Sequence, residues 1–186
     1  MSMKGFTLIE TLIAITILTL AIAGPMVTAS RAIVAAQTAR DQLTASYLAQ
    51  EGIEYVRAMR DNEYLTAYQV GGSDVSTTAW NNFLAVSINQ CREATCTLDP
   101  SRSMGSGSGF SLVPCSGDSC APLHLTQLSN GAYGYTQQDG TATPFTRTIQ
   151  AIDISSGDER IVSKVSWRFH DIPYSVIVTD NLTPWQ

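Results

Sequence analysis

Histidine is scarce in this chain of 186 residues, which contains only His124 and His170. The two residues are far apart in sequence and fall in stretches that we predict to be loops or turns, so their spacing supports neither a metal triad nor a Ser-His-Asp set. A phosphate-binding loop is also absent, because the glycine-rich run 105–109 lacks the Lys-Ser/Thr pair that such a loop requires. We therefore expect no catalytic residues, no enzymatic activity and no cofactor.

A strong charge of either sign is lacking as well. The chain has 16 acidic and 11 basic residues, and its net charge of −5 becomes −6 if Lys4, with its one positive charge, is removed by processing. Such mild acidity argues against nucleic acid or an anionic lipid surface as the main partner. No twelve-residue Ca²⁺ loop is present, so Asp153, Asp158 and Glu159 predict a solvated acidic turn, and we expect no metal site.

A long apolar run near the N-terminus is the most informative feature that the chain does have. No side chain from Thr11 to Ser30 is ionisable, and at about 1.5 Å of helical rise per residue this run reaches roughly 30 Å, the thickness of a bilayer's hydrocarbon core. Glu10 lies at the edge of the run, where a buried charge costs about 3 kcal/mol unless it has a partner. The run predicts a membrane helix. For Glu10 we expect either a functional role or a side chain that extends to water at the depth of the lipid headgroups.

The residues that lead into this run, Lys4-Gly5-Phe6-Thr7-Leu8-Ile9-Glu10, resemble the N-terminal signal of type IV prepilins and of type II secretion pseudopilins. The resemblance implies that a prepilin peptidase cuts between Gly5 and Phe6 and methylates the new amine of Phe6. It also implies assembly into a filament by helix-to-helix packing with other pilins or pseudopilins, with help from an inner-membrane assembly platform. In such a filament the amine of Phe6 can approach Glu10 of a neighbouring subunit, which would give this carboxylate a partner.

The topology follows from the same segment. Lys4 and the resemblance together imply a single-pass inner-membrane protein with its N-terminus in the cytoplasm before assembly, and an extracellular or periplasmic filament afterwards. An alternative is an ordinary signal peptide, with residues 12–20 as its apolar core and cleavage after Ala23, that exports a secreted or membrane-anchored binding or enzymatic domain. We favour the prepilin interpretation because Glu10 interrupts the lead-in and the apolar run continues past Ala23.

The helical pattern continues beyond the membrane segment. We predict a leader over 1–5 and one helix over 6–61, transmembrane over 6–29 and amphipathic over 30–61, with a kink or loosened turn at Gly24 and Pro25. Charged residues such as Glu51, Glu54 and Arg57 are expected to form a solvated surface. Small or apolar residues recur at three- and four-residue spacing and predict a face that packs under a head: Ala45, Leu48, Ala49, Gly52, Ile53, Tyr55, Val56 and Met59.

The remaining residues, 62–186, are enough for one head domain. Turn formers dominate up to about residue 140, and three alternating runs at 145–154, 160–169 and 174–180 then predict an antiparallel meander. Its inward face, Ile161 or Val162 with Val165 and Trp167, is expected to cover the helix. The outline is an α+β fold, a long N-terminal helix packed on a small C-terminal antiparallel sheet, and the pilin resemblance implies the same fold.

Cysteine is limited to Cys91, Cys96, Cys115 and Cys120, which form two pairs of C-x4-C spacing. Zinc sites commonly use tighter C-x2-C knuckles. The cysteines lie in a segment that we expect to be exported to an oxidising compartment, so we predict disulfides. We prefer the two local pairs because the residues between them suit tight turns, while a nested pairing of Cys91 with Cys120 and Cys96 with Cys115 stays open.

A more specific resemblance lies in residues 47–54, Tyr-Leu-Ala-Gln-Glu-Gly-Ile-Glu, which look like a segment of minor or PilV-like pilins. The loop-rich head and the placement of Pro25 also favour a minor subunit. The sequence is compatible with a type IV pilus, a competence pilus or a type II secretion pseudopilus.

Overall fold

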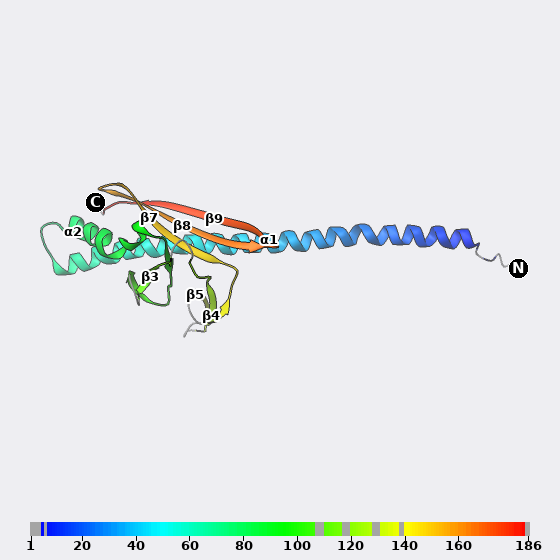
Figure 1. The fold of residues 1–186 in the computed structure, drawn as a ribbon, viewed down its shortest axis with the longest axis horizontal. Helices are drawn as coiled ribbons and strands as arrows, with labels where there is room; N and C mark the ends of the chain where they lie inside the picture. The colour runs from blue at the N-terminus through cyan, green and yellow to red at the C-terminus, as the bar shows by residue number, and fades with distance from the viewer. Residues whose placement is uncertain are drawn as a thin grey trace. The chain divides into compact units, whose positions relative to one another are not determined.

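The computed structural model describes Gly5 and residues 7–106, 110–116, 120–127, 131–137 and 140–184. The chain divides into two compact units, residues 1–41 and residues 42–186. Helix α1 (Leu8–Val70) begins in the first unit and ends in the second (Figure 1). Most of the predicted leader, and Phe6, lie outside the described residues.

The two ends of α1 are capped in different ways. At the start, the backbone N–H of Glu10 donates to Oγ1 of Thr7 at 3.4 Å, which is half of a Thr-x-x-Glu capping box. At the other end, Gly71 adopts a φ of +78° and its N–H donates to the carbonyl of Ala67 at 3.1 Å. The predicted end at Asp61 is therefore wrong: Asp61 and Asn62 continue the helix, which ends at Val70 before the left-handed Gly71.

The proline within α1 does not end the helix, which runs unbroken through Gly24 and Pro25. Pro25 supplies no N–H to the helical ladder. The hydroxyl of Thr28, one turn later, donates to the carbonyls of Gly24 and Pro25 at 3.3 and 2.9 Å. The loosening of this turn stays a prediction.

The region predicted to be loop-rich contains several short elements. Helix α2 begins after Asp74, whose Oδ1 accepts from the N–H of Thr77 at 3.2 Å, and it buries Trp80. A π-helical turn η1, a short helix α3 and six short strands follow. Their bounds are α2 (Val75–Asn82), η1 (Phe83–Ser87), α3 (Gln90–Glu93), β1 (Cys96–Leu98), β2 (Ser103–Ser106), β3 (Phe110–Pro114), β4 (His124–Gln127), β5 (Tyr133–Thr136) and β6 (Thr141–Ala142).

The predicted meander is confirmed as β7 (Thr146–Ser155), β8 (Asp158–Phe169) and β9 (Ile172–Leu182), which lie side by side in Figure 1 and pair antiparallel. The sheet is larger than predicted, with strand order β2-β3-β1-β7-β8-β9, and β5-β4-β6 form a second sheet. His170 and Asp171 connect β8 to β9 with φ values of 47° and 63°, as a two-residue hairpin turn of type I′ requires.

Alternate residues of β7 and β8 face α1. Ile161 is fully buried and Val162 is not, which resolves the choice that the sequence left between them. The predicted helix face is also confirmed, although Tyr55 is only half-buried. Two clusters form the core: Ile53, Val56, Met59, Trp80, Phe83, Ile88, Cys91, Cys96, Leu98, Leu112, Ile149, Ala151, Ile161 and Leu182, and Ala45, Leu48, Ala49, Leu123, Phe145, Val165 and Trp167.

Helix and sheet approach most closely at Gly52. A Cβ at this position would lie 2.5 Å from Oγ of Ser163 and 2.8 Å from Cδ1 of Ile149. Both distances are shorter than a non-bonded carbon contact permits. Glycine at position 52 therefore lets α1 sit directly on the strands β7 and β8.

A charged side chain is buried beside this contact. Arg147 of β7 is 0% exposed, and it donates from Nη1 to the carbonyl of Leu48 at 3.2 Å and to Oε2 of Glu51. Its Nη2 donates to the carbonyl of Leu98 in β1 at 2.9 Å. Burial lowers the pKa of Arg147, and the charge of Glu51 opposes this effect. One guanidinium thus joins α1, β7 and β1, and Glu51 is a structural partner rather than part of a purely solvated surface.

Replacing Gly52 with valine tests the close approach. We expect Gly52→Val to lower the free energy of unfolding of the head by about 1–3 kcal/mol, because the added carbons displace Ser163 and Ile149. Gly24→Val is the matched control, since a Cβ there meets nothing within 4 Å, and it should change head unfolding by less than about 0.5 kcal/mol. Denaturant unfolding of the full chain in detergent micelles measures both, and equal effects would contradict the packing argument.

Removing the carboxylate of Glu51 tests the buried arginine. Glu51→Gln should destabilise the head by about 1–3 kcal/mol, because the buried guanidinium of Arg147 then has only neutral acceptors. Glu54→Gln breaks an exposed pair with Arg57 and should cost no more than about 0.5 kcal/mol. The same unfolding measurement compares the two variants. A loss of stability in Glu54→Gln as large as that in Glu51→Gln would show that the buried pair carries no special weight.

Candidate functional site

The N-terminal part of α1 presents an apolar surface that no described residue of its own unit covers. Among the described residues, one helix near the N-terminus is long and apolar enough to cross a membrane, and none of its most apolar stretch is buried. Large side chains remain exposed along it, from 83% at Leu8 to 52% at Val27. An apolar surface of this extent requires lipid or other apolar helices around it.

Glu10 lies in the first turn of α1, where the helix dipole favours a negative charge. Its backbone N–H is satisfied by Thr7, whose carbonyl accepts at 3.1 Å. Among the described residues, the carboxylate itself takes part in no ion pair and no hydrogen bond. The structure therefore holds the carboxylate at the positive end of the helix and leaves its oxygens available to a cation from elsewhere.

Gly5 precedes the helix and is exposed. A Cβ at Gly5 would meet nothing within 4 Å, so its backbone is open to an approaching enzyme. Phe6, on the other side of the predicted cleavage site and the predicted N-methylated residue, lies outside the described residues. The geometry at Gly5 is thus compatible with proteolysis before α1 begins.

The four cysteines form the two local disulfides that the sequence favoured. Cys91 and Cys96 have Cα atoms 5.3 Å apart, are fully buried and connect α3 to β1. Cys115 and Cys120 have Cα atoms 4.9 Å apart and are only half-buried. The first disulfide is therefore part of the core, and the second is partly exposed.

An ion pair reinforces the first disulfide loop. Arg92 donates from Nε to Oε1 of Glu159 at 2.9 Å, and its Nη2 bonds Oε2 of the same carboxylate. The hydrogen bond to Glu159 raises the pKa of Arg92. Glu159 is 0% exposed, so its predicted place in a solvated acidic turn is wrong: the carboxylate points inward and is neutralised by Arg92.

The histidines do not form a site. His124 lies on β4 rather than in the predicted loop, with Thr136 and Ala142 as its cross-strand neighbours. His170 occupies the exposed turn between β8 and β9, as predicted. Within the part of the chain that the structure describes, no group of three or more His, Cys, Asp and Glu side chains is placed to hold a metal ion.

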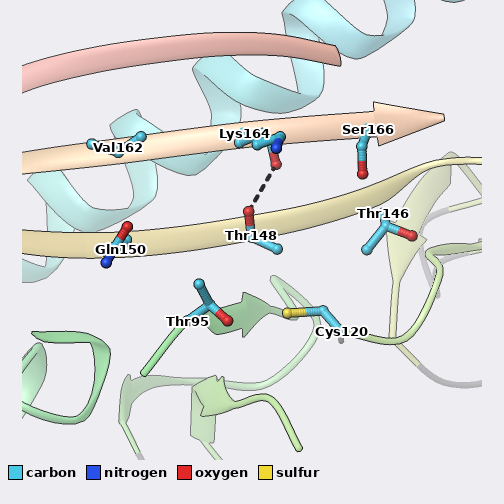
Figure 2. Close-up of a pocket in the computed structure, with 8 residues that line it drawn as sticks. All are labelled: Thr95, Cys120, Thr146, Thr148, Gln150, Val162, Lys164 and Ser166. Carbon is cyan, nitrogen blue, oxygen red and sulfur yellow. Dashed lines mark hydrogen bonds between the residues drawn. The ribbon is translucent and has the colours of Figure 1, made fainter. Parts of the chain in front are cut away.

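A polar groove of about 450 Å³ lies on the outward face of the large sheet (Figure 2). Sequence reasoning missed this groove. The one available signal was the alternation of polar side chains along β7 and β8, which reads equally well as a solvated sheet face. The lining residues are Thr95, Cys120, Thr146, Thr148, Gln150, Val162, Lys164 and Ser166.

Comparison with known proteins identifies the N-terminal segment. Residues 1–24 match the family model described as the prokaryotic N-terminal methylation motif. No curated protein and no solved structure matches the chain. The matched segment contains Gly5, Glu10 and the first part of the exposed apolar helix. This match supports the resemblance of the N-terminal segment to the signal of type IV prepilins and pseudopilins.

Proposed function

We propose that the chain is a structural subunit, a minor pilin or pseudopilin, of a type IV pilus or a type II secretion-like filament. A prepilin peptidase cuts it between Gly5 and Phe6 and methylates Phe6, and the chain then assembles through its N-terminal helix. The observation that carries the proposal is the apolar helix that begins at Leu8, shortly after the accessible Gly5. It is exposed among the described residues and carries Glu10 in its first turn.

Two environments can cover this helix in succession. Before assembly, the apolar run fits a bilayer, with the N-terminus in the cytoplasm and the head outside. After assembly, helices of neighbouring pilins take the place of lipid. Glu10 then enters an apolar interior, where a carboxylate needs a cationic partner, and the amine of Phe6 on another subunit supplies it.

The head supports a structural rather than an enzymatic role in this proposal. Among the described residues of the head, the buried charged groups are Asp99, Arg147 and Glu159, and all three make contacts that hold the fold together. The minor-subunit assignment rests on residues 47–54, on the turn-rich sequence of the head and on the placement of Pro25. The PilV-like label rests on residues 47–54.

Intact-mass measurement of the mature protein tests processing. We expect the mass of a chain that has lost residues 1–5 and gained one methyl group at Phe6, and deletion of the prepilin peptidase should restore the full-length mass. A chain shortened after Ala23 would instead show an ordinary signal peptide. That result would overturn the filament proposal, because the assembly helix would be lost.

Substitution of Glu10 tests assembly separately from processing. Glu10→Ala should leave the mature mass correct apart from the substitution, yet reduce the fraction of protein recovered in sheared filaments about tenfold or more, because the pairing with the Phe6 amine is lost. Glu93→Ala removes an exposed carboxylate from the head and serves as the matched control. Normal filament recovery of Glu10→Ala would rule out the pairing role.

A further inference from the structure

The groove on the outward face of the large sheet has the size and the chemistry of a binding site. Its volume of about 450 Å³ falls within the range of small-molecule sites. Figure 2 shows side chains of β7 and β8 lining it, with Thr95 and Cys120 on the other side. Three cross-strand pairs supply the β7 and β8 residues: Thr146 with Ser166, Thr148 with Lys164, and Gln150 with Val162.

The groove lies on the face opposite α1. Residues of β7 and β8 that alternate with the lining residues face the helix, as the contact of Arg147 with Leu48 shows. Successive side chains of a strand point to opposite faces, so Thr146 and Thr148 point away from the helix. The Cys115–Cys120 disulfide links Cys120, which lines the groove, to the residue that follows β3. The groove is therefore lined by paired strands and by a cysteine that a disulfide holds.

Lys164 is the one charged residue among the eight that line the groove. Its cross-strand neighbours on the same face are Thr148 in β7 and Ile177 in β9, and neither is charged. The nearest residues on that face of β8 itself, Val162 and Ser166, are neutral as well. An exposed ammonium group surrounded by neutral side chains attracts an anion.

The two arginines that flank Lys164 on this face of β8 form hydrogen bonds outside the groove. Arg168 donates from Nη2 to the carbonyl of Asp171 at 2.7 Å, and Arg160 donates from Nε to Oδ1 of Asn181 at 3.4 Å. Both are exposed on the same face as Lys164. They add positive potential to this face of an otherwise acidic chain, and they leave Lys164 as the cation within the groove.

The neutral lining residues narrow the chemical class of ligand that the groove can bind. Threonine and serine hydroxyls both donate and accept hydrogen bonds, and so does the amide of Gln150. Sugar hydroxyls have the same dual capacity, whereas phosphate diesters only accept. Single-stranded nucleic acid is further disfavoured because its sites stack bases on aromatic side chains, and none of the eight lining residues is aromatic.

We propose that this groove binds an acidic saccharide. The ammonium of Lys164 pairs with a sugar carboxylate, and the hydroxyls of Thr146, Thr148 and Ser166 bond the sugar hydroxyls. The proposal does not depend on filament assembly, since it concerns the head alone and stands if the N-terminal helix has another role.

Lysine chemistry gives a direct test, because the chain contains only Lys4 and Lys164. The uncleaved full-length protein in detergent micelles is treated with an acetylating succinimidyl ester, and the acetylation of each lysine is followed by mass spectrometry. Digalacturonate at saturation should slow acetylation of Lys164 about tenfold and leave that of Lys4 unchanged. Neutral galactobiose should protect neither lysine. An absence of protection by digalacturonate, or equal protection by galactobiose, would overturn the proposal.

Equilibrium dialysis with digalacturonate tests the individual side chains. Lys164→Met should weaken binding about tenfold or more, whereas Lys164→Arg should retain it, because a charge-assisted hydrogen bond is lost only in the first. Thr148→Val should weaken binding several-fold. Thr179→Val, the matched control, removes an exposed hydroxyl from β9 outside the groove and should have no effect.

Two outcomes of the dialysis would contradict the assignment. Unchanged binding by Lys164→Met would remove the carboxylate contact. Tighter binding of tetraglutamate than of digalacturonate would show that the groove takes an acidic peptide and not a saccharide.

Discussion

The close approach of α1 to the sheet at Gly52 determines how the head is packed. With no side chain at this position, the helix rests on Ser163 and Ile149, and the apolar residues on either side of Gly52 enter the two core clusters. Arg147 follows from the same geometry, because only a helix this near can present the carbonyl of Leu48 and the carboxylate of Glu51 to a strand residue. One small residue thus controls both the apolar packing and the buried charge.

How much of the fold could be predicted from the sequence depends on the length of each element, because a short element shows no period. The helix face repeats over several turns, and the strands β7, β8 and β9 are each at least ten residues long, so periodicity identified both. Strand β1 has three residues and α3 has four, too few to show a period. The end of α1 was misplaced because Asp61 and Asn62 resemble a stop signal, although both continue the helix.

The buried charges were beyond sequence reasoning for another reason. Arg147 and Glu51 are 96 residues apart, and Arg92 and Glu159 are 67 apart. No local pattern joins such partners, and a charged residue in a strand is ordinarily assigned to the solvated face. The N-terminal site was the opposite case, because its signal is a continuous segment that the match over residues 1–24 covers. This site is thus readable from the local sequence, while the buried charges of the head are not.

The burial of the Cys91–Cys96 disulfide bears on the order of events during maturation. Both cysteines are 0% exposed in the folded head, so no oxidant can reach the sulfur atoms once the core has closed. The bond must therefore form while the head is still open, in a compartment that supports oxidation. Oxidation and closure of the head then follow one another in time, and a chain that closed early would enclose two thiols that later oxidation cannot join.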